Sequence, residues 1–233
     1  MNGLTAPAQG LRFRTEGGET AFTRSLVREH RLQLRVNGAD FAQLVCTRSQ
    51  LRELVLGRLC TAGKISGLED VISLAFFDEE SRGEVSLRPG AEGGKRNPLK
   101  DEIGWSQADI LRLAAGVREA MPLHDETLGT HGALILYRGE VKCCCEDIGR
   151  HNALDKAVGW ALTHGLPLRE CLLYTTGRIA ADVVEKAAAA GICVLLSRAL
   201  PTAEAVDLAK RLGMTLMGRA WEEQYELYAD GRS

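Results

Sequence analysis

The stretch 170-ECLLYTTGRIAADVVEKAAAAGICVLLSRALPTAEAVDLAKRLGMTLMG-218 decides the fold class. Three short apolar runs alternate there with two segments in which apolar residues recur at helical spacing. The runs are 170–176, 192–197 and 214–218, and the helical segments are 178–191 and 201–213. Strands that are apolar throughout are buried on both faces, as in a parallel sheet covered by helices. The stretch therefore predicts a layered α/β/α fold.

The same alternation begins further upstream. The run 133-ALILYRGEVKCCC-145 predicts two antiparallel strands around Arg138-Gly139, and residues 152–165 predict a helix. A further helix is expected from Ser106, which can cap it with Asp109 at the third position, to about Met121. After that helix, the predicted order of elements is β-β-α-β-α-β-α-β, which indicates a parallel sheet sandwiched between helices.

The first half predicts a smaller α+β unit. Asn37-Gly38 is a tight-turn signal between runs that partly alternate in polarity, which predicts a hairpin. A helix follows, with Gly63 as its stop, and then two strands at 71–77 and 84–88. The segment 89-PGAEGGKRNPLKDEIGW-105 is typical of a linker. We therefore expect a flexible lead-in over 1–24, a small domain with its linker over 25–104, and a ligand-binding domain over 105–233.

Composition limits the classes of function. The 233 residues include 29 basic and 31 acidic ones, a net charge of −2, which argues against a nucleic-acid or membrane-surface partner. No apolar run reaches the roughly 18 residues that a membrane span needs. The N-terminus has no apolar signal-peptide core, so a cytoplasmic location is expected. The seven cysteines are odd in number and include no C-x-x-C pair, so neither a disulfide framework nor a metal site is expected.

Polar clusters follow three of the predicted strands. Because ligands of open α/β sheets bind where strands end and helices begin, these clusters predict a site for an anion such as phosphate or a carboxylate. Capping and surface ion pairs are the alternative explanation of any single cluster. His131, before the first strand, is either a ligand contact or a buried core residue. The candidate residues are His131, Glu146, Asp147, Arg150, His151, Asn152, Thr176, Gly177, Arg178, Ser197, Arg198 and Thr202.

The three consecutive cysteines precede the first cluster. Neighbours on a strand point to opposite faces, so Cys143 and Cys145 share one face and Cys144 takes the other. All three suit a buried strand as small apolar residues. Cys145 is the one candidate for a reactive thiol, because it adjoins the polar cluster, where helix dipoles and arginines lower a thiol pKa.

These motifs together resemble one family. The run 146-EDIGRHNALDK-156 is similar to the E-D-[VI]-G-R-H-N-A-x-D-K signature of the FdhD family, the sulfurtransferase accessory proteins of formate dehydrogenase. Further matching segments run in the same order between about residues 30 and 228. They are LVCTRSQLRELVLGRLCTAGKI, the T-H-x-A match at 130–133, and SRALPTAEAVDLAKRLGMTLMG.

The resemblance implies a cytidine deaminase-like C-terminal domain and a homodimer. It also implies that sulfur passes, as a persulfide from a cysteine desulfurase, to a molybdenum or tungsten bis-molybdopterin guanine dinucleotide cofactor. The cofactor then enters formate dehydrogenase or another molybdoenzyme. A GDP-like nucleotide is a second expected ligand.

The chain departs from this family at two places. The family carries its sulfur on a C-G-x-C-G loop, and the equivalent segment here, 89–105, contains no cysteine. The tail has 218-GRAW-221 in place of a G-F-x-[RK] segment. Three hypotheses follow: a sulfur carrier that uses Cys145 or another cysteine, a cofactor-binding or guanine-nucleotide-binding paralogue that moves no sulfur, and an unrelated small-molecule enzyme on the same scaffold.

Overall fold

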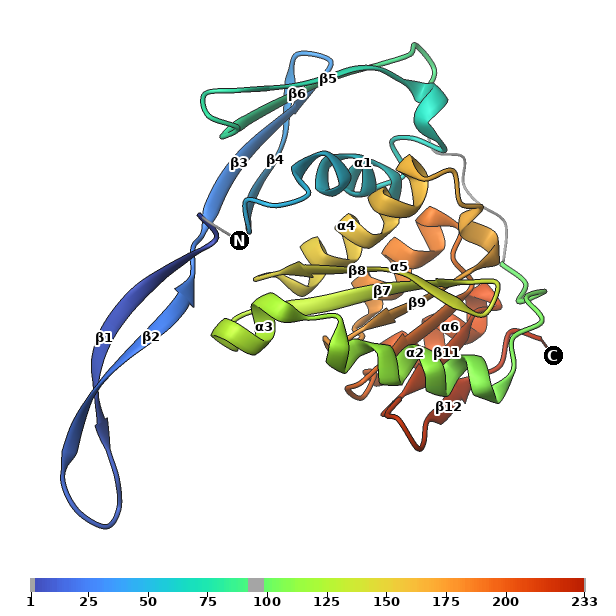
Figure 1. The fold of residues 1–233 in the computed structure, drawn as a ribbon. Coiled ribbons are helices and arrows are strands. Elements are labelled where there is room, and N and C mark those ends of the chain that lie inside the picture. The colour runs from blue at the N-terminus through green and yellow to red at the C-terminus, as the bar shows by residue number, and fades with distance from the viewer. Residues whose placement is uncertain (1–2, 92–98, 233) are drawn as a thin grey trace.

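The computed structural model describes residues 3–91 and 99–232, and its centre is a six-stranded sheet (Figure 1). The sheet has the spatial order β12-β11-β10-β9-β7-β8. Its strands are β7 (His131–Tyr137), β8 (Glu140–Asp147), β9 (Cys171–Thr175), β10 (Val194–Ser197), β11 (Thr215–Gly218) and β12 (Glu226–Ala229). Helices lie on both faces of this sheet, and the fold is mixed α/β with several sheets, which agrees with the predicted α/β class.

The sheet is mixed, and the prediction of a parallel sheet is only partly right. Strands β9, β10 and β11 are parallel, as the alternation with helices predicted. Strand β7 is antiparallel to both β8 and β9, and β12 is antiparallel to β11. The hairpin at Arg138-Gly139, with φ values of 52° and 75°, pairs β7 with β8. Because β7 also pairs with β9, it lies between β8 and β9 and interrupts the parallel order of the sheet.

The helices divide between the two faces. Helices α4, α5 and α6 follow β8, β9 and β10 and lie on one face, whereas α2 and α3 lie on the other (Figure 1). The predicted capping box is present at the start of α2, where Ser106 accepts from the Asp109 N–H. The helices are α2 (Gln107–Glu119), α3 (Pro122–Thr127), α4 (Arg150–Thr163), α5 (Ala181–Ala190) and α6 (Ala203–Leu212).

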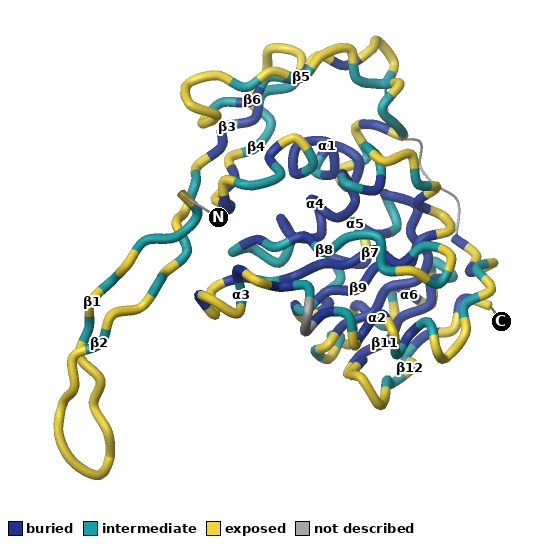
Figure 2. Tube along the Cα trace, viewed as in Figure 1, coloured by how far each residue is buried: buried dark blue, intermediate teal, exposed yellow. Residues whose placement is uncertain are grey.

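A smaller sheet of order β4-β3-β6-β5 stands above the main body. The Asn37-Gly38 turn has φ values of 50° and 82°, so the predicted hairpin is confirmed. Helix α1 (Leu51–Thr61) follows it and continues the buried core into the large sheet (Figure 2). The strands are β3 (His30–Val36), β4 (Ala39–Cys46), β5 (Val71–Phe77) and β6 (Arg82–Leu87), and two short 3₁₀ turns lie at Leu68–Asp70 and Leu168–Glu170.

Helices α1 and α4 cross at two glycines. A Cβ atom on Gly57 would lie 1.7 Å from the backbone oxygen of Asp155, and one on Gly159 would lie 1.9 Å from the backbone oxygen of Glu53. Only residues without side chains allow this approach. The first half of the chain is therefore packed tightly on the second. The division near residue 104 stays a prediction, and part of its linker, 92–98, lies outside the described residues.

The expected lead-in over residues 1–24 is wrong where the structure describes it. Residues 5–27 form a long antiparallel hairpin of β1 (Thr5–Phe13) and β2 (Glu19–Val27), which projects from the body (Figure 1). Nine pairs of residues face each other along it. Most of its side chains are exposed (Figure 2), so the alternation of polarity that marks a half-buried strand is weak in this sequence.

Candidate functional site

The ends of four strands meet at one edge of the large sheet. β8, β9 and β10 end there, and β7 begins there because it is antiparallel to its neighbours. The Thr176 N–H donates to the Gly132 oxygen over 2.9 Å, and the Arg198 N–H donates to the Thr175 oxygen over 3.2 Å. The topology therefore brings the three predicted polar clusters and His131 together.

A bulge in β8 sets the direction of the side chains that enter this edge. The register with β7 shifts between Ile135 and Leu136, which face Cys143 and Val141, so Lys142 is the extra residue. Beyond the bulge, Glu146 lies opposite Gly132 and Asp147 lies opposite His131. The two adjacent acids consequently project from opposite faces of the sheet.

Asp147 lies on the face covered by α4, where it is completely buried. One carboxylate oxygen pairs with Lys156 Nζ at 2.7 Å and accepts from the Thr47 N–H at 3.0 Å. The other accepts from the Gly149 N–H and from Asn152 Nδ2. Asp147 and Asn152 are thus saturated by internal partners that join the strand end to α4 and to the loop after β4.

Glu146 lies on the opposite face and holds α3. Its carboxylate accepts from the backbone N–H groups of Leu123 and His124, at 3.0 and 2.7 Å, and from the Thr130 hydroxyl at 2.9 Å. These N–H groups belong to the first turn of α3, which no residue of its own caps. Glu146 therefore positions a helix at the edge where the strands end.

Two adjoining cavities open beside this edge, with volumes of about 450 and 930 Å³. Three of the predicted residues line them: His131, Thr176 and Arg198. The smaller cavity is lined by Val117, Met121, His124, Asp125, Leu128, Gly129, Thr130, His131, Ile148, Thr176 and Arg198. The larger one shares several of these and adds Tyr174 and the segment 219–224, among others.

His131 and Thr176 form one wall. The Thr176 hydroxyl accepts from the Gly132 N–H at 3.0 Å and lies 3.4 Å from His131 Nδ1. Burial, and then the positive charges of Arg150 and His124, lower the pKa of His131. At neutral pH this wall therefore presents an uncharged imidazole.

Arg198 supplies a cation at the opening of the larger cavity. Its guanidinium carbon lies 4.0 Å from the centre of the Trp221 ring, and both side chains are exposed. The turn that carries Trp221 is closed by a hydrogen bond from the Trp221 N–H to the Gln224 oxygen. The Tyr174 hydroxyl holds the start of this turn by donating to the Ala220 backbone oxygen. An aromatic ring with one guanidinium against it thus borders the cavity, which Asp125, Glu222 and Glu223 also line.

Arg150 and Gly177 lie in contact next to the cavities. A Cβ atom on Gly177 would lie 2.8 Å from Cβ of Arg150. Arg150 Nε is buried and has no hydrogen-bond partner among the described residues, and His151 Nδ1 is in the same state. His151 Nε2 lies 3.4 Å from the Asp182 carboxylate, and burial lowers its pKa. Arg178 is exposed in the loop before α5.

The remaining candidates hold the backbone. The Ser197 hydroxyl donates to the Gly177 oxygen and accepts from the Ala199 N–H, and the Thr202 hydroxyl caps α6. Helix α5 begins at Ala181, three residues later than predicted, because residues near Ile179 are extended and pair with Pro201.

The cysteines are mostly buried. Cys145 is completely buried, and Gln50 Nε2 donates to its sulfur over 3.5 Å. Burial is the largest of the effects that raise the pKa of Cys144. It is also the largest effect on Cys46, Cys171 and Cys193, whose pKa values are raised to about 12. Cys143 and Cys145 lie opposite Ile135 and Ala133 of β7, which confirms that these two cysteines share a face. The contact with Cys145 raises the pKa of Cys143. Cys145 as a reactive thiol stays a prediction.

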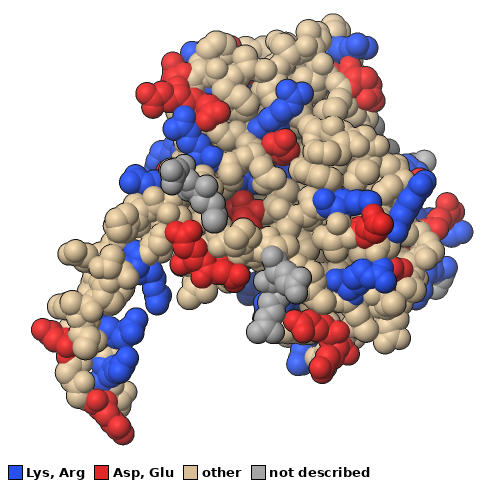
Figure 3. Space-filling model, in the orientation of Figure 1, with Lys and Arg blue, Asp and Glu red and all other residues tan. Residues whose placement is uncertain are grey.

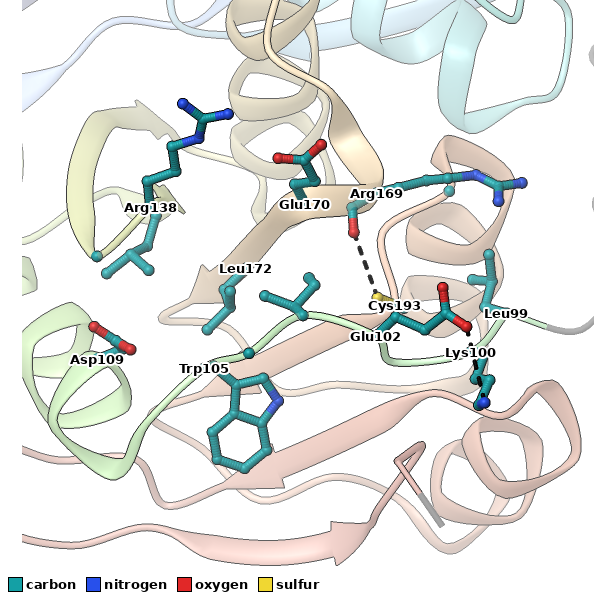
Figure 4. Close-up of a pocket in the computed structure, with 15 residues that line it drawn as sticks. Leu99, Lys100, Glu102, Trp105, Asp109, Arg138, Arg169, Glu170, Leu172 and Cys193 are labelled. Atoms are coloured by element: carbon teal, nitrogen blue, oxygen red, sulfur yellow. Dashed lines mark hydrogen bonds and ion pairs between the residues drawn. The ribbon is translucent and has the colours of Figure 1, made fainter.

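A further cavity of about 840 Å³ lies at the opposite end of the sheet (Figure 4). Trp105, Arg138 and Glu170 surround it, together with Cys193, whose sulfur donates to the Arg169 oxygen. None of the predicted site residues lines this cavity.

Sequence reasoning did not select the α3 residues of the site. His124, Asp125 and Leu128 line both cavities, yet the sequence offered no helix signal there except Pro122 at the first helical position. In the sequence, Trp221 stands out only because the tail departs there from the family motif. Its proximity to Arg198 depends on a loop contact that sequence spacing does not reveal.

Within residues 3–91 and 99–232 no group of three or more His, Cys, Asp or Glu side chains could hold a metal ion. Across the same described residues, no helix has the length and apolar character that crossing a membrane would require.

Comparison with known proteins agrees with the motif at 146–156. Residues 90–233 match the model of the FdhD/NarQ family. The sulfur carrier protein FdhD of Geobacillus kaustophilus is 30% identical, with 98% of this chain and 97% of that protein covered. The protein of the same name from Halalkalibacterium halodurans is 32% identical over 87% of this chain and 86% of its own length.

A solved structure is similar as well. A crystal structure described as that of a formate dehydrogenase accessory protein from Desulfotalea psychrophila superposes with a TM-score of 0.84. It is 28% identical, and 97% of each chain is covered. The chain belongs to the FdhD/NarQ family.

Proposed function

We propose that this protein is an accessory factor for formate dehydrogenase or another molybdoenzyme. Its substrate in this proposal is a molybdenum or tungsten cofactor with guanine dinucleotide arms, bound in the cavities at the strand ends. Family membership supports the accessory role. The observation that carries the ligand class is that Arg198 lines both cavities, of about 930 and 450 Å³, while His131 lines the smaller one and Arg150 lies against Gly177, the residue after Thr176 of that lining.

The residues present fit the phosphates of such a ligand. Arg150 Nε is a buried donor without a partner in the described part of the chain, and Arg178 and Arg198 are exposed at neighbouring strand ends. Helix α5 begins without a side-chain cap, so its first N–H groups add a positive end of a dipole. Bidentate guanidinium contacts to phosphate oxygens are strong and directional.

A guanine base fits the other side of the site. The exposed ring of Trp221 offers a surface for stacking, and Arg198 already lies against it. Carboxylates of Glu222 and Glu223 line the same cavity and are acceptors for base N–H groups.

Binding of GDP, measured by titration calorimetry, tests the ligand class. We expect Arg198→Ala and Arg150→Ala each to weaken GDP binding at least tenfold, the loss expected of a charge-assisted phosphate contact. Arg169→Ala is the matched control, because Arg169 lines the cavity at the opposite end of the sheet. Wild-type protein that does not bind GDP, or equal affinities in all variants, would refute the assignment.

Sulfur transfer is the second part of the proposal, and two alternatives exist within the family. A sulfur carrier needs a thiolate that takes the terminal sulfur of a desulfurase persulfide and releases the desulfurase thiolate. The segment 89–105 contains no cysteine, and the pKa values of Cys46, Cys143, Cys144, Cys171 and Cys193 are raised. These observations favour a cofactor-binding paralogue that moves no sulfur.

Intact-protein mass spectrometry after incubation with a cysteine desulfurase and free cysteine distinguishes the two. A paralogue without sulfur transfer gains no mass and still binds GDP. The gain of one sulfur atom, mapped to Cys145 and absent in Cys145→Ser, would establish a sulfur carrier with a relocated thiol.

A further inference from the structure

A cavity of about 840 Å³ lies at the end of the large sheet opposite the proposed cofactor site (Figure 4). Strands β9 and β10 begin at this end, and β7 ends there. Cavities of roughly 300–1,000 Å³ are the usual size of small-molecule sites. None of the residues that line the two cavities of the proposed cofactor site lines this one, so it is a separate candidate site.

One wall of this cavity is the segment 99–105, which is held in place by buried hydrogen bonds. The buried Asp101 carboxylate accepts from Trp105 Nε1 over 2.7 Å and from the Thr215 hydroxyl over 2.5 Å. The guanidinium carbon of Arg232 lies 4.0 Å from the centre of the Trp105 ring. The position of the Trp105 ring is therefore fixed before any ligand binds.

The floor of the cavity is apolar. It is formed by Leu136, Leu172 and Cys193, which are almost completely buried. Burial, and then the charge of Asp101, raises the pKa of Cys193 to about 12, so the thiol in the floor is uncharged. An apolar side chain of a ligand would leave water on contact with this floor and the neighbouring Trp105 ring, which stabilises binding.

Most charged groups around the cavity have partners within the chain. Lys100 Nζ lies 3.8 Å from the Glu102 carboxylate, and the Asp109 carboxylate caps the start of α2. Arg138 and Glu170 are the exceptions. Both side chains are exposed, and neither makes a hydrogen bond or an ion pair with another residue of the described ranges 3–91 and 99–232.

Arg138 and Glu170 offer one positive and one negative group to a ligand. Figure 4 shows these two side chains on the same side of the cavity, whereas the Arg169 side chain points away from them. The Arg138 guanidinium carbon lies 5.0 Å from the centre of the Tyr137 ring, a contact that uses none of its N–H donors. A guanidinium group binds a carboxylate through parallel hydrogen bonds, and a carboxylate accepts from an ammonium group. The two residues therefore suit a ligand with one carboxylate and one ammonium group.

The helix polarity at this end of the sheet disfavours a ligand with several phosphates. Helix α5 ends at Ala190, and the next residue, Gly191, lines the cavity. The C-terminal end of a helix carries a partial negative charge, which attracts cations and repels anions. On the face shown in Figure 3, Lys and Arg side chains stand among Asp and Glu over the main body, without a large patch of one sign. A zwitterion fits such surroundings better than a polyanion.

We propose that this cavity binds a short peptide that has free ends and an apolar side chain. The peptide carboxylate pairs with Arg138, its ammonium group pairs with Glu170, and its side chain packs on Leu136 and Leu172 beside Trp105. A cavity of about 840 Å³ is large enough for a ligand of about two or three residues. This site does not depend on the proposed cofactor.

Titration calorimetry of the full chain with the tripeptide Gly-Phe-Gly tests the site. We expect binding, and roughly tenfold or weaker affinity for the N-acetylated and the C-amidated peptide, since each lacks one charge-assisted contact. Gly-Ser-Gly should bind roughly tenfold more weakly as well, because it lacks the apolar side chain. No binding of Gly-Phe-Gly, or equal affinities for the four peptides, would overturn the proposal.

Two variants assign the charged contacts. Glu170→Gln should bind the free and the N-acetylated peptide equally well, and Arg138→Gln should bind the free and the C-amidated peptide equally well. The matched controls are Glu185→Gln on α5 and Arg31→Gln on β3, which change exposed charges that do not line the cavity. Both controls should discriminate among the peptides as the wild type does. Discrimination that survives in the Glu170 and Arg138 variants, or that is lost equally in the controls, would contradict the assignment.

The three tryptophans locate the bound peptide. Trp105 lines this cavity, Trp221 lines the larger cavity of the proposed cofactor site, and Trp160 lies on α4. In a ¹H–¹⁵N spectrum, Gly-Phe-Gly should shift the indole N–H resonance that is absent from Trp105→Phe and leave the other two in place. A shift of the Trp221 resonance in place of that of Trp105, or of neither, would overturn the proposal.

Discussion

Lys156 Nζ lies 2.7 Å from Oδ2 of Asp147, and both side chains are fully buried. The same ammonium group donates to the Thr47 hydroxyl over 2.6 Å and to the Glu146 backbone oxygen over 3.1 Å. The pair thereby joins α4, the end of β8 and the loop after β4. A buried pair of this kind is costly to break, because the remaining charge keeps no counter-ion.

The first prediction concerns this pair. Lys156→Met should lower the free energy of unfolding by about 3–5 kcal/mol, since Asp147 then stays buried without its cation. Urea denaturation measures the change. Lys142→Met is the control, because Lys142 pairs with Glu140 at the surface and its loss should be close to experimental error. Equal changes in the two variants would contradict a structural role of the buried pair.

The second prediction concerns the crossing of α1 and α4. Gly159→Ala places a methyl group against the Glu53 backbone and should cost about 3 kcal/mol or more, because neither helix can yield without losing its packing. Gly116→Ala is also helical, but its nearest neighbour is a Val141 methyl at 3.3 Å. There the gain in helix propensity offsets the contact, and the change should stay within about 1 kcal/mol. Thermal unfolding of both variants decides the matter.

The third prediction concerns Glu146 and α3. Glu146→Ala leaves two N–H groups of α3 without an acceptor and should cost about 1–3 kcal/mol. Since α3 residues line both cavities, GDP affinity should fall as well. Glu146→Gln keeps one acceptor oxygen and should give intermediate values of stability and affinity. If the alanine variant binds GDP as tightly as the wild type, α3 does not shape the ligand site.

The fourth prediction concerns pH. Burial lowers the pKa of His131 below its usual 6.5, so below that pH the unfolded chain binds the proton more readily than the folded one. Stability should therefore fall as the pH decreases from about 6.5 through the folded pKa. His131→Gln should flatten this dependence in urea midpoints measured between pH 8 and pH 5. His151 contributes in the same sense, so a variant with both changes should be flattest. Parallel curves for wild type and variants would disprove the assignment.

The sequence predicted most of the core elements because their signals are local. The turns at Asn37-Gly38 and Arg138-Gly139, the capping box at Ser106 and the alternation over 170–218 all appear in the structure. The family motif at 146–156 lies at the edge of the sheet where β8, β9 and β10 end. The motif alone does not tell which of its residues face the cavities and which hold the backbone. The side chains of Glu146 and Asp147 point in opposite directions, and this follows from strand pairing.

The elements that sequence reasoning missed depend on distant contacts. Helix α3 has six residues and is held by Glu146, more than twenty positions away. Strand β12 has four residues and pairs antiparallel to β11 at the sheet edge. The β1–β2 hairpin includes Pro7 and Gly10 and buries little of itself, so neither propensity nor alternation marks it. Its pairing is visible only in the folded chain.

The bulge at Lys142 sets which face of the sheet each later side chain of β8 takes. If Lys142 instead paired with Ile135 in a regular ladder, every later residue of β8 would shift by one position along β7 and its side chain would change face. Glu146 would then lie opposite His131, where Asp147 now lies, and Lys156 would face Glu146 in its place. Because Val141 pairs with Leu136 and Cys143 pairs with Ile135, deletion of Lys142 should remove the bulge and keep both acids on their present faces.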